Sequence, residues 1–371
     1  MQRFQLQKIK TDLLKKMVII VGPRQVGKTW LSIEVMKSFS NSMYLNFDNS
    51  HHRKIIEDQS WLDDVELLVF DEIHKMKDWK QYIKGVYDTR LSHQKILVTG
   101  SARLDTFNQS GDSLAGRFYR HRLFPFTVPE LAEINYPYSL EKLSNLGGFP
   151  EPFLGGEEDA SRWRLQYVNG LIREDVLDFE KIHDLKKMKY LLEMLRERVG
   201  STLSYSSLAR DLELHPATVK KYIMILESLF VIFLISPHSK SISRSILKES
   251  KFYFYDVGLI KEDKGAKYEN LVALHLLQYV QFSRDYKGKD ISLNFIRTKE
   301  KKEIDFALVE NGSLTQFIEC KYKDNGVSKT LSYFSEKYGV KGIQLVMNLK
   351  NEFSSKFCEV RKASLYLKNL V

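Results

Sequence analysis

The feature that most constrains the fold of this 371-residue chain is the stretch GPRQVGKT, residues 22–29. It has the spacing G-x-x-x-x-G-K-[ST], directly after the apolar run MVIIV and before the segment WLSIEVMKSF. Two glycines let a backbone curl so that its N–H groups point inward, and a helix that starts there adds partial positive charge. The sequence therefore predicts a strand, a phosphate-binding loop and a helix in succession.

The positions of this loop have distinct expected roles. Lys28 is expected to reach the β- and γ-phosphates of a nucleotide, and the Thr29 hydroxyl to ligate Mg²⁺. The Asn-Lys-x-Asp stretch with which small GTPases read guanine does not occur in the sequence, so ATP and Mg²⁺ are the expected cofactors. The residues expected to surround the nucleotide are Gly22, Pro23, Arg24, Gln25, Val26, Gly27, Lys28, Thr29 and Trp30.

A second motif, LLVFDE at residues 67–72, complements the loop. Four apolar residues place Asp71 at the carboxyl end of a buried strand, where α/β sheets bind their ligands. Asp71 is expected to hold Mg²⁺ through water, and Glu72 to polarise the attacking water. The two motifs together predict ATP hydrolysis.

Short, nearly continuous apolar runs recur through the first 130 residues, as is typical of parallel strands covered on both faces. The pattern is helical from Ala160 to Leu229, and strands return after Pro237. The expected class is α/β: a doubly wound parallel sheet, then helices, then a second α/β domain. The expected boundaries are 1–135 for the phosphate-loop domain, 136–180 for linker and lid helices, 181–240 for a winged-helix-like region and 241–371 for the last domain.

The composition points to an anionic partner inside the cell. The formal net charge is +10, which favours an anionic partner such as nucleic acid, ATP or a membrane surface. Two cysteines, Cys320 and Cys358, make no disulfide framework, and the first residues have no secretory apolar core. The longest apolar run, residues 229–235, is far shorter than the roughly 20 residues of a membrane helix. We expect a cytoplasmic protein without a membrane partner.

The segment YSSLARDLELHPATVKKYIMILESL, residues 205–229, has the pattern of a helix-turn-helix in which Glu213 replaces the usual turn glycine. The second helix would present polar residues to the major groove of DNA or to its phosphates. The alternative is a packing module or a lid. The candidate DNA contacts are His215, Thr218, Lys220 and Lys221.

Near the C-terminus, Asp305 is followed fourteen residues later by Glu319-x-Lys321, the pattern of the PD-(D/E)xK nucleases, with Glu269 upstream as a further carboxylate. Such sites need carboxylates for a metal ion and a lysine to activate water. A two-residue Asn-Gly turn would put Asp305 and Glu319 on opposite faces, whereas a three-residue loop would put both with Lys321 on one face. The metal site requires the three-residue loop.

The stretches GPRQVGKT, LLVFDEIHK, ILVTGSAR and SLAGRFYRHRLFPF together resemble a prokaryotic AAA+ family of ATPases. In that family the ATPase is usually followed by a domain of unknown function that resembles a restriction-endonuclease core. The resemblance extends over nearly the whole chain. It implies a sensor role for Ser101 near the γ-phosphate and an arginine-finger role for Arg117 towards a neighbouring subunit of a homo-oligomer.

Three functions remain open at this point. The first is an ATPase whose nucleotide state is coupled to DNA binding or assembly. The second is a regulatory switch in which the nuclease-like domain is an inactive docking surface for a protein partner. The third is an ATP-gated, metal-dependent endonuclease.

Overall fold

A computed structural model describes residues 3–100, 114–171, 184–239, 249–261, 263–298, 300, 302–323 and 326–370. The chain divides into two compact units, which are described separately. Unit 1 comprises residues 1–124 with 228–230, and unit 2 comprises residues 125–227 and 231–371. Among the described residues, no helix is long and apolar enough to cross a membrane.

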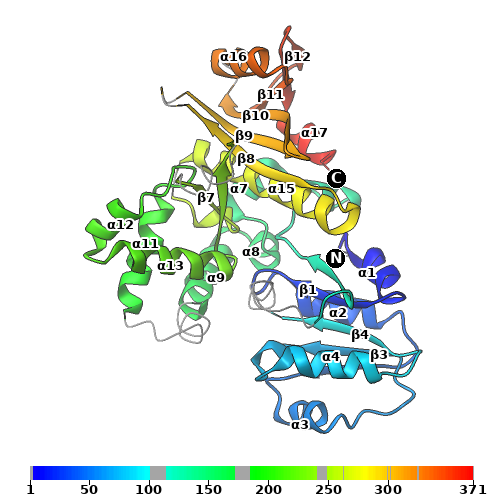
Figure 1. Ribbon diagram of the computed structural model, residues 1–371. Helices are drawn as coiled ribbons and strands as arrows, with labels where there is room; N and C mark the ends of the chain where they lie inside the picture. The colour runs from blue at the N-terminus through cyan, green and yellow to red at the C-terminus, as the bar shows by residue number, and fades with distance from the viewer. Residues whose placement is uncertain are drawn as a thin grey trace. The chain divides into compact units, whose positions relative to one another are not determined.

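Unit 1 is a five-stranded parallel sheet with the order β2-β3-β4-β1-β5 (Figure 1). Its strands are β1 (Met17–Val21), β2 (Ser42–Asn46), β3 (Leu67–Asp71), β4 (Lys95–Thr99) and β5 (Phe118–Arg122). Its helices are α1 (Leu6–Leu13), α2 (Lys28–Met36), α3 (Ser50–Asp58) and α4 (Trp79–Thr89), with the short turn η1 (Ile73–Lys75) after β3.

The apolar runs form this sheet because both of its faces are covered. Every residue of β1 and of β3 is buried. Ile19 and Phe70 pack in one core with Ile83 of α4 and Ile56 of α3, while α1 also contacts β1. The predicted doubly wound parallel sheet is confirmed.

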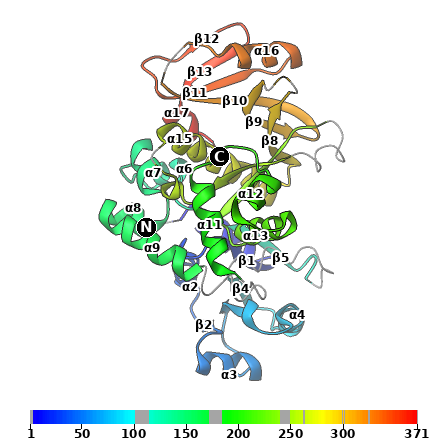
Figure 2. The ribbon, with the colours of Figure 1, turned by 90° about the vertical axis from the view of Figure 1, so that its left-hand side faces the viewer.

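Unit 2 begins with helices and ends in a mixed sheet (Figure 2). The helices before the sheet are α6 (Val128–Glu133), α7 (Leu140–Leu146), α8 (Pro150–Gly155), α9 (Glu157–Gly170), α11 (Leu185–Arg196), α12 (Tyr205–Leu212) and α13 (Pro216–Ser228). The later ones are η4 (Val257–Leu259), α15 (Lys264–Lys287), α16 (Lys329–Tyr338) and α17 (Ala363–Lys368).

The sheet of unit 2 has eight strands in the order β12-β13-β11-β10-β9-β8-β6-β7. They are β6 (Ile232–Pro237), β7 (Lys251–Phe254), β8 (Ile291–Arg297), β9 (Glu303–Glu310), β10 (Ser313–Lys323), β11 (Gly342–Asn348), β12 (Phe353–Ser354) and β13 (Cys358–Lys362). Phe317 and Ala307 pack with Phe334 of α16, whereas Tyr322 meets Tyr268 of α15 on the other face. The expected helical region followed by an α/β domain is confirmed.

Candidate active site

The loop between β1 and α2 has the backbone that its glycines predict. Gly22 has φ +151°, and a Cβ there would collide with the carbonyl oxygen of Leu123. Gly27 has φ +98° directly before α2, and Gln25 also has a positive φ of 60°. Lys28 is buried, and its ammonium donates to the carbonyl oxygens of Gly22 at 3.0 Å and of Pro23 at 2.7 Å. The side chain of Lys28 therefore packs against the backbone of the phosphate loop.

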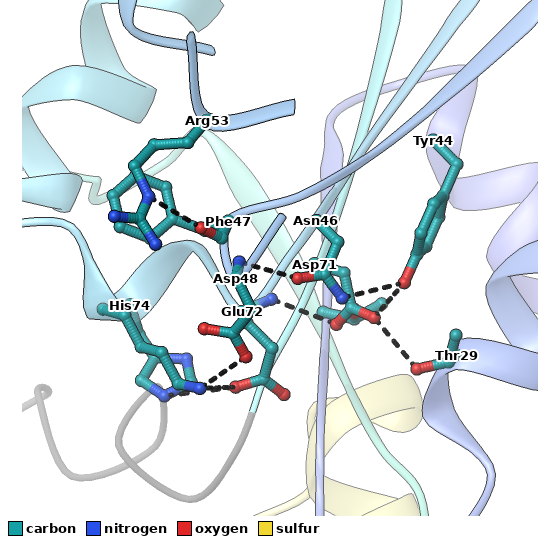
Figure 3. A network of polar contacts seen from close by, with 11 residues as sticks. Thr29, Tyr44, Asn46, Phe47, Asp48, Arg53, Asp71, Glu72 and His74 are labelled. Carbon is teal, nitrogen blue, oxygen red and sulfur yellow. Dashed lines mark hydrogen bonds and ion pairs between the residues drawn. The ribbon is translucent and has the colours of Figure 1, made fainter. Parts of the chain in front are cut away.

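Asp71, at the end of β3, accepts hydrogen bonds on both carboxylate oxygens (Figure 3). Its Oδ2 accepts from the Thr29 hydroxyl at 2.9 Å and from the Tyr44 hydroxyl at 2.5 Å. Its Oδ1 accepts from the Thr99 hydroxyl and from the backbone N–H of Glu72 at 3.1 Å. Only 2% of Asp71 is exposed, so these bonds replace the water that a carboxylate needs. The carboxylate is fixed next to the start of α2.

Glu72 lies in a left-handed conformation with φ 56°, which turns it away from the strand direction. Its Oε2 is 3.5 Å from His74 Nε2 and 3.9 Å from Lys75 Nζ, and Lys75 in turn pairs with Asp48 at 2.6 Å. Burial, followed by the negative charge of Asp71, raises the pKa of Glu72. Glu72 is thus a more basic carboxylate than a free one, as a general base requires.

These residues fit a magnesium ion. Mg²⁺ prefers hard oxygen ligands, usually from one or two protein groups together with phosphates and water. The Thr29 hydroxyl and the Asp71 carboxylate, which come from segments 42 residues apart, are hydrogen-bonded to each other. When bound with a nucleotide, the ion would neutralise the charge of the phosphates.

The other residues of the expected nucleotide loop differ in exposure. Pro23 and Val26 are buried, Arg24 is half-buried, and Gln25 and Trp30 are exposed. Ser101, the expected sensor, falls in residues 101–113, outside the described part of the chain. Trp30, in the first turn of α2, has 38% of its surface exposed.

Arg117 lies at the edge of the parallel sheet opposite the phosphate loop. Its carbonyl oxygen accepts from the N–H of Met17, the first residue of β1, whereas the loop follows the last residue of β1. The length of β1, about 16 Å for five residues, therefore separates the two. The guanidinium of Arg117 binds Asp88 of α4 with both Nε, at 2.8 Å, and Nη2, at 3.1 Å. Arg117 cannot reach the loop of its own chain from this position.

The helices α12 and α13 form as the sequence predicts, joined by a short turn. Glu213 occupies the glycine position with φ 52°. His215 is exposed, and its Nδ1 accepts from the N–H of Ala217. Lys220 and Lys221 are exposed on α13, and Thr218 is half-buried. Of the candidate contacts, Lys220 and Lys221 are therefore on the solvent side of α13, and His215 is exposed in the turn before it.

The hairpin of β9 and β10 has a register that neither loop length predicted. Glu310 pairs with Ser313, so the turn is the two-residue Asn311-Gly312, both with positive φ; the three-residue loop is wrong. A β-bulge between Leu314 and Gln316 then shifts the register by one residue. Phe317 pairs with Ala307 and Ile318 with Phe306 as a result. The bulge thus puts Phe317, and with it the alternate residues Glu319 and Lys321, on the opposite face from the one that the two-residue turn alone would give them.

The carboxylates of this region are bound by neighbouring protein groups. Lys321 Nζ lies 2.7 Å from Glu319 Oε1, and the N–H of Cys320 donates to Asp305 Oδ2 at 2.8 Å. Desolvation, and then the charge of Glu269, raises the pKa of Asp305 to about 8. In the described residues, no group of three or more His, Cys, Asp and Glu side chains is placed to hold a metal ion.

A buried lysine that the sequence did not single out lies among these acids. Lys251 Nζ is 2.6 Å from Glu303 Oε1 and 3.5 Å from Glu269 Oε1, and only 3% of its side chain is exposed. Glu269 also accepts from the Tyr253 hydroxyl at 2.7 Å. Burial alone would lower the pKa of Lys251, but Glu269, Asp305 and Glu303 together raise it. The ammonium of Lys251 therefore provides a positive charge among Glu269, Glu303 and Asp305.

Three family models match successive parts of the chain. Residues 14–132 match a family model described as an AAA domain. Residues 138–267 and 264–363 match two families described only as domains of unknown function.

The relatives found by sequence are uncharacterized proteins. One from Mycobacterium tuberculosis is 26% identical over 245 residues, which are 66% of this chain and 55% of that protein. The match therefore spans about half the length of the mycobacterial relative. One from Methanocaldococcus jannaschii is 24% identical over 374 residues, covering 90% of this chain and 81% of that protein.

Among solved structures, a Walker-type ATPase of Pyrococcus abyssi is similar, with 16% identity and a TM-score of 0.44 over 69% of this chain and 93% of that one. A RuvB of Thermotoga maritima has 16% identity and a TM-score of 0.33 over 61% and 87% of the two chains. The family match and the parallel sheet with its phosphate loop make unit 1 an AAA-type, ATPase-like domain.

Proposed function

We propose that unit 1 binds ATP with Mg²⁺ and hydrolyses it. The observation that carries this proposal is the hydrogen bond of 2.9 Å between the Thr29 hydroxyl and Asp71 Oδ2. It brings the two expected magnesium-binding groups together at the start of α2, beside the buried ammonium of Lys28. The N–H groups of the loop and the helix N-terminus would hold the phosphates.

Hydrolysis is assigned to Glu72. Its raised pKa makes it a better proton acceptor for an attacking water than a solvated carboxylate, and its place directly after Asp71 keeps it near the phosphates. His74 and Lys75 hold one of its oxygens in the described structure. The substrate class is a nucleoside triphosphate, with ATP favoured over GTP.

The test compares the wild type with Glu72→Gln and Lys28→Ala. Gln keeps the size of the side chain but cannot accept a proton, so we expect ATP binding to persist while phosphate release falls by at least about 10²-fold. Lys28→Ala should weaken binding itself. Undiminished turnover in Glu72→Gln would remove Glu72 from the mechanism, and a wild type that binds no ATP would reject the proposal as a whole.

We further propose that nucleotide state is coupled to DNA binding or to assembly of the chain with itself or a protein partner. Support for DNA comes from the exposed Lys220 and Lys221 on α13, from the exposed His215 just before it, and from the net charge of +10. Duplex binding measured from 50 to 200 mM salt should weaken steeply, because each phosphate contact releases a counterion. Replacing Lys220 and Lys221 by Ala should reduce the slope of log affinity against log salt by about 2. An unchanged slope would place DNA elsewhere or nowhere.

In a second candidate function, unit 2 is a docking scaffold without nuclease activity. The position of Lys251 favours this function. Its ammonium lies between Glu269 and Glu303, where a nuclease would need the carboxylates free for a metal ion. The test is plasmid nicking with Mg²⁺ or Mn²⁺ by the wild type and by Asp305→Ala. Nicking that disappears in Asp305→Ala would establish the endonuclease instead.

A further inference from the structure

Among the described residues, Tyr44 is the side chain of β2, the strand next to β3, that donates a hydrogen bond to the Asp71 carboxylate. Tyr44 pairs in register with Val69, and Asn46, two residues on, pairs with Asp71. The phenol therefore extends along the sheet towards its carboxyl edge and ends at the aspartate (Figure 3). No motif in the sequence points to this tyrosine.

The two oxygens of Asp71 are not equivalent. Oδ1 is bound by Thr99, the last residue of the neighbouring strand β4, and by the backbone N–H of Glu72, which directly follows Asp71. Oδ2 is bound by Thr29 and Tyr44. Thr29 supplies the hydroxyl that the motif assigns to the metal, so Oδ2 is the oxygen that faces the metal side, and Tyr44 is what holds it there.

The hydroxyl of Tyr44 is itself held in place. It accepts a hydrogen bond from the Asn46 amide at 3.3 Å while it donates to Asp71 at 2.5 Å. The Tyr44 hydroxyl therefore has both a donor and an acceptor that fix its position. A carboxylate that could otherwise rotate about its χ2 is kept in one orientation by this contact.

We propose that Tyr44 is a positioning residue that sets the affinity of the nucleotide site for Mg²⁺ by orienting Asp71. The proposal rests on the proposed ATP site, which it deepens. Tyr44 touches neither phosphate nor metal in this assignment and acts through the carboxylate. Loss of its hydroxyl should leave the phosphate loop intact, so that only the binding of Mg²⁺ is weakened.

The experiment measures binding of a fluorescent ATP analogue carrying a methylanthraniloyl group, first in EDTA and then during titration with MgCl₂. The variants are Tyr44→Phe and, as a matched control, Tyr119→Phe on β5, whose ring lies against Lys16. One hydrogen bond to a charged group corresponds to about a tenfold change in an equilibrium constant. We expect Tyr44→Phe to need about tenfold more Mg²⁺ at the midpoint, with its affinity in EDTA and that of Tyr119→Phe unchanged.

Three outcomes would overturn the role of Tyr44. Equal Mg²⁺ midpoints in Tyr44→Phe and the wild type would show that the hydroxyl does not position Asp71. An equal loss of affinity in EDTA would show that Tyr44 shapes the pocket as a whole. A wild type that does not bind the analogue would overturn the ATP site itself, and this result is distinct because it needs no variant.

Discussion

The buried ion cluster of unit 2 gives the sharpest prediction about stability. Lys251 is 3% exposed in its side chain, whereas the side chains of Glu269 and Glu303 are 25% and 27% exposed. Removing one partner of a buried ion pair costs about 3–5 kcal/mol, since the remaining charge is left uncompensated. The partial exposure of both glutamates places Lys251→Met below that range, at about 2–3 kcal/mol.

For a unit of this size, such a loss lowers the unfolding midpoint by about 5–10 °C. The measurement is thermal unfolding of the full chain at neutral pH. The matched control is Lys289→Met, because Lys289 forms a comparable contact of 2.9 Å with Glu310 but is 41% exposed. A surface pair contributes about 0–1 kcal/mol, so this control should lose much less.

The same variant tests whether the lysine stands in for a metal ion. Without the ammonium, Glu269, Glu303 and Asp305 repel one another, and MnCl₂ should raise the unfolding midpoint of Lys251→Met but not that of Lys289→Met. Equal midpoints for the two variants would refute the reasoning about burial. A rise with MnCl₂ that is as large in the wild type would refute the idea that Lys251 supplies the cation.

Three further predictions concern the rest of the chain. If Arg117 acts on a neighbouring subunit, mixing the inactive variants Arg117→Ala and Lys28→Ala should restore part of the ATPase rate, and no restoration would exclude that role. Burial, opposed by Asp12, lowers the pKa of His121 to about 4. As the pH falls from 6.5 towards 4, the unfolded state therefore binds a proton before the folded state does, and the free energy of unfolding decreases by roughly 1.4 kcal/mol per pH unit. This decrease should be absent from His121→Gln when unfolding midpoints of the two proteins are compared across that pH range. Glu213→Gly should stabilise unit 2 in chemical unfolding by about 0.5–1 kcal/mol, since a left-handed backbone suits glycine, and a destabilised variant would contradict this.

The sequence predicts the strand, loop and helix at residues 17–36 and the strand that ends at Asp71, because this information is local. The loop, Lys28 and Thr29 lie in one stretch, and the apolar run before Asp71 defines a strand end, so both motifs could be placed before any strand order was known. Tyr44 could not be found in this way. Its contact with Asp71 depends on β2 lying next to β3, which is a property of the sheet order.

Unit 2 was harder to predict because its groups meet across long sequence separations. Lys251 reads as an ordinary residue at the start of an apolar strand, and only the sheet brings it to Glu303, 52 residues later. Helix periodicity, in contrast, identified α12 and α13, since their buried positions repeat along one face. The helices and strands of unit 2 could be predicted from the sequence, whereas the contacts between its side chains could be found only in the structure.

The register of the β9–β10 hairpin shows how two local preferences combine, and it can be tested by a deletion. Asn311-Gly312 favours a two-residue turn with positive φ at both positions, whereas Phe317 must face α16, and the extra residue Thr315 reconciles the two. The Thr315 hydroxyl donates to the Leu308 carbonyl oxygen at 3.1 Å and so helps to hold the bulge.

Deleting Thr315 should remove the bulge and leave the same residues paired after it. We therefore expect the deletion variant to fold, with an unfolding midpoint lowered by no more than about 5 °C, a loss of about 1–2 kcal/mol. In a hairpin without a bulge, the same deletion would turn Phe317, Glu319 and Lys321 to the opposite face and expose the apolar core under α16. A deletion variant that fails to fold, while Thr315→Val folds normally, would refute the register and with it the pairing of Phe317 with Ala307.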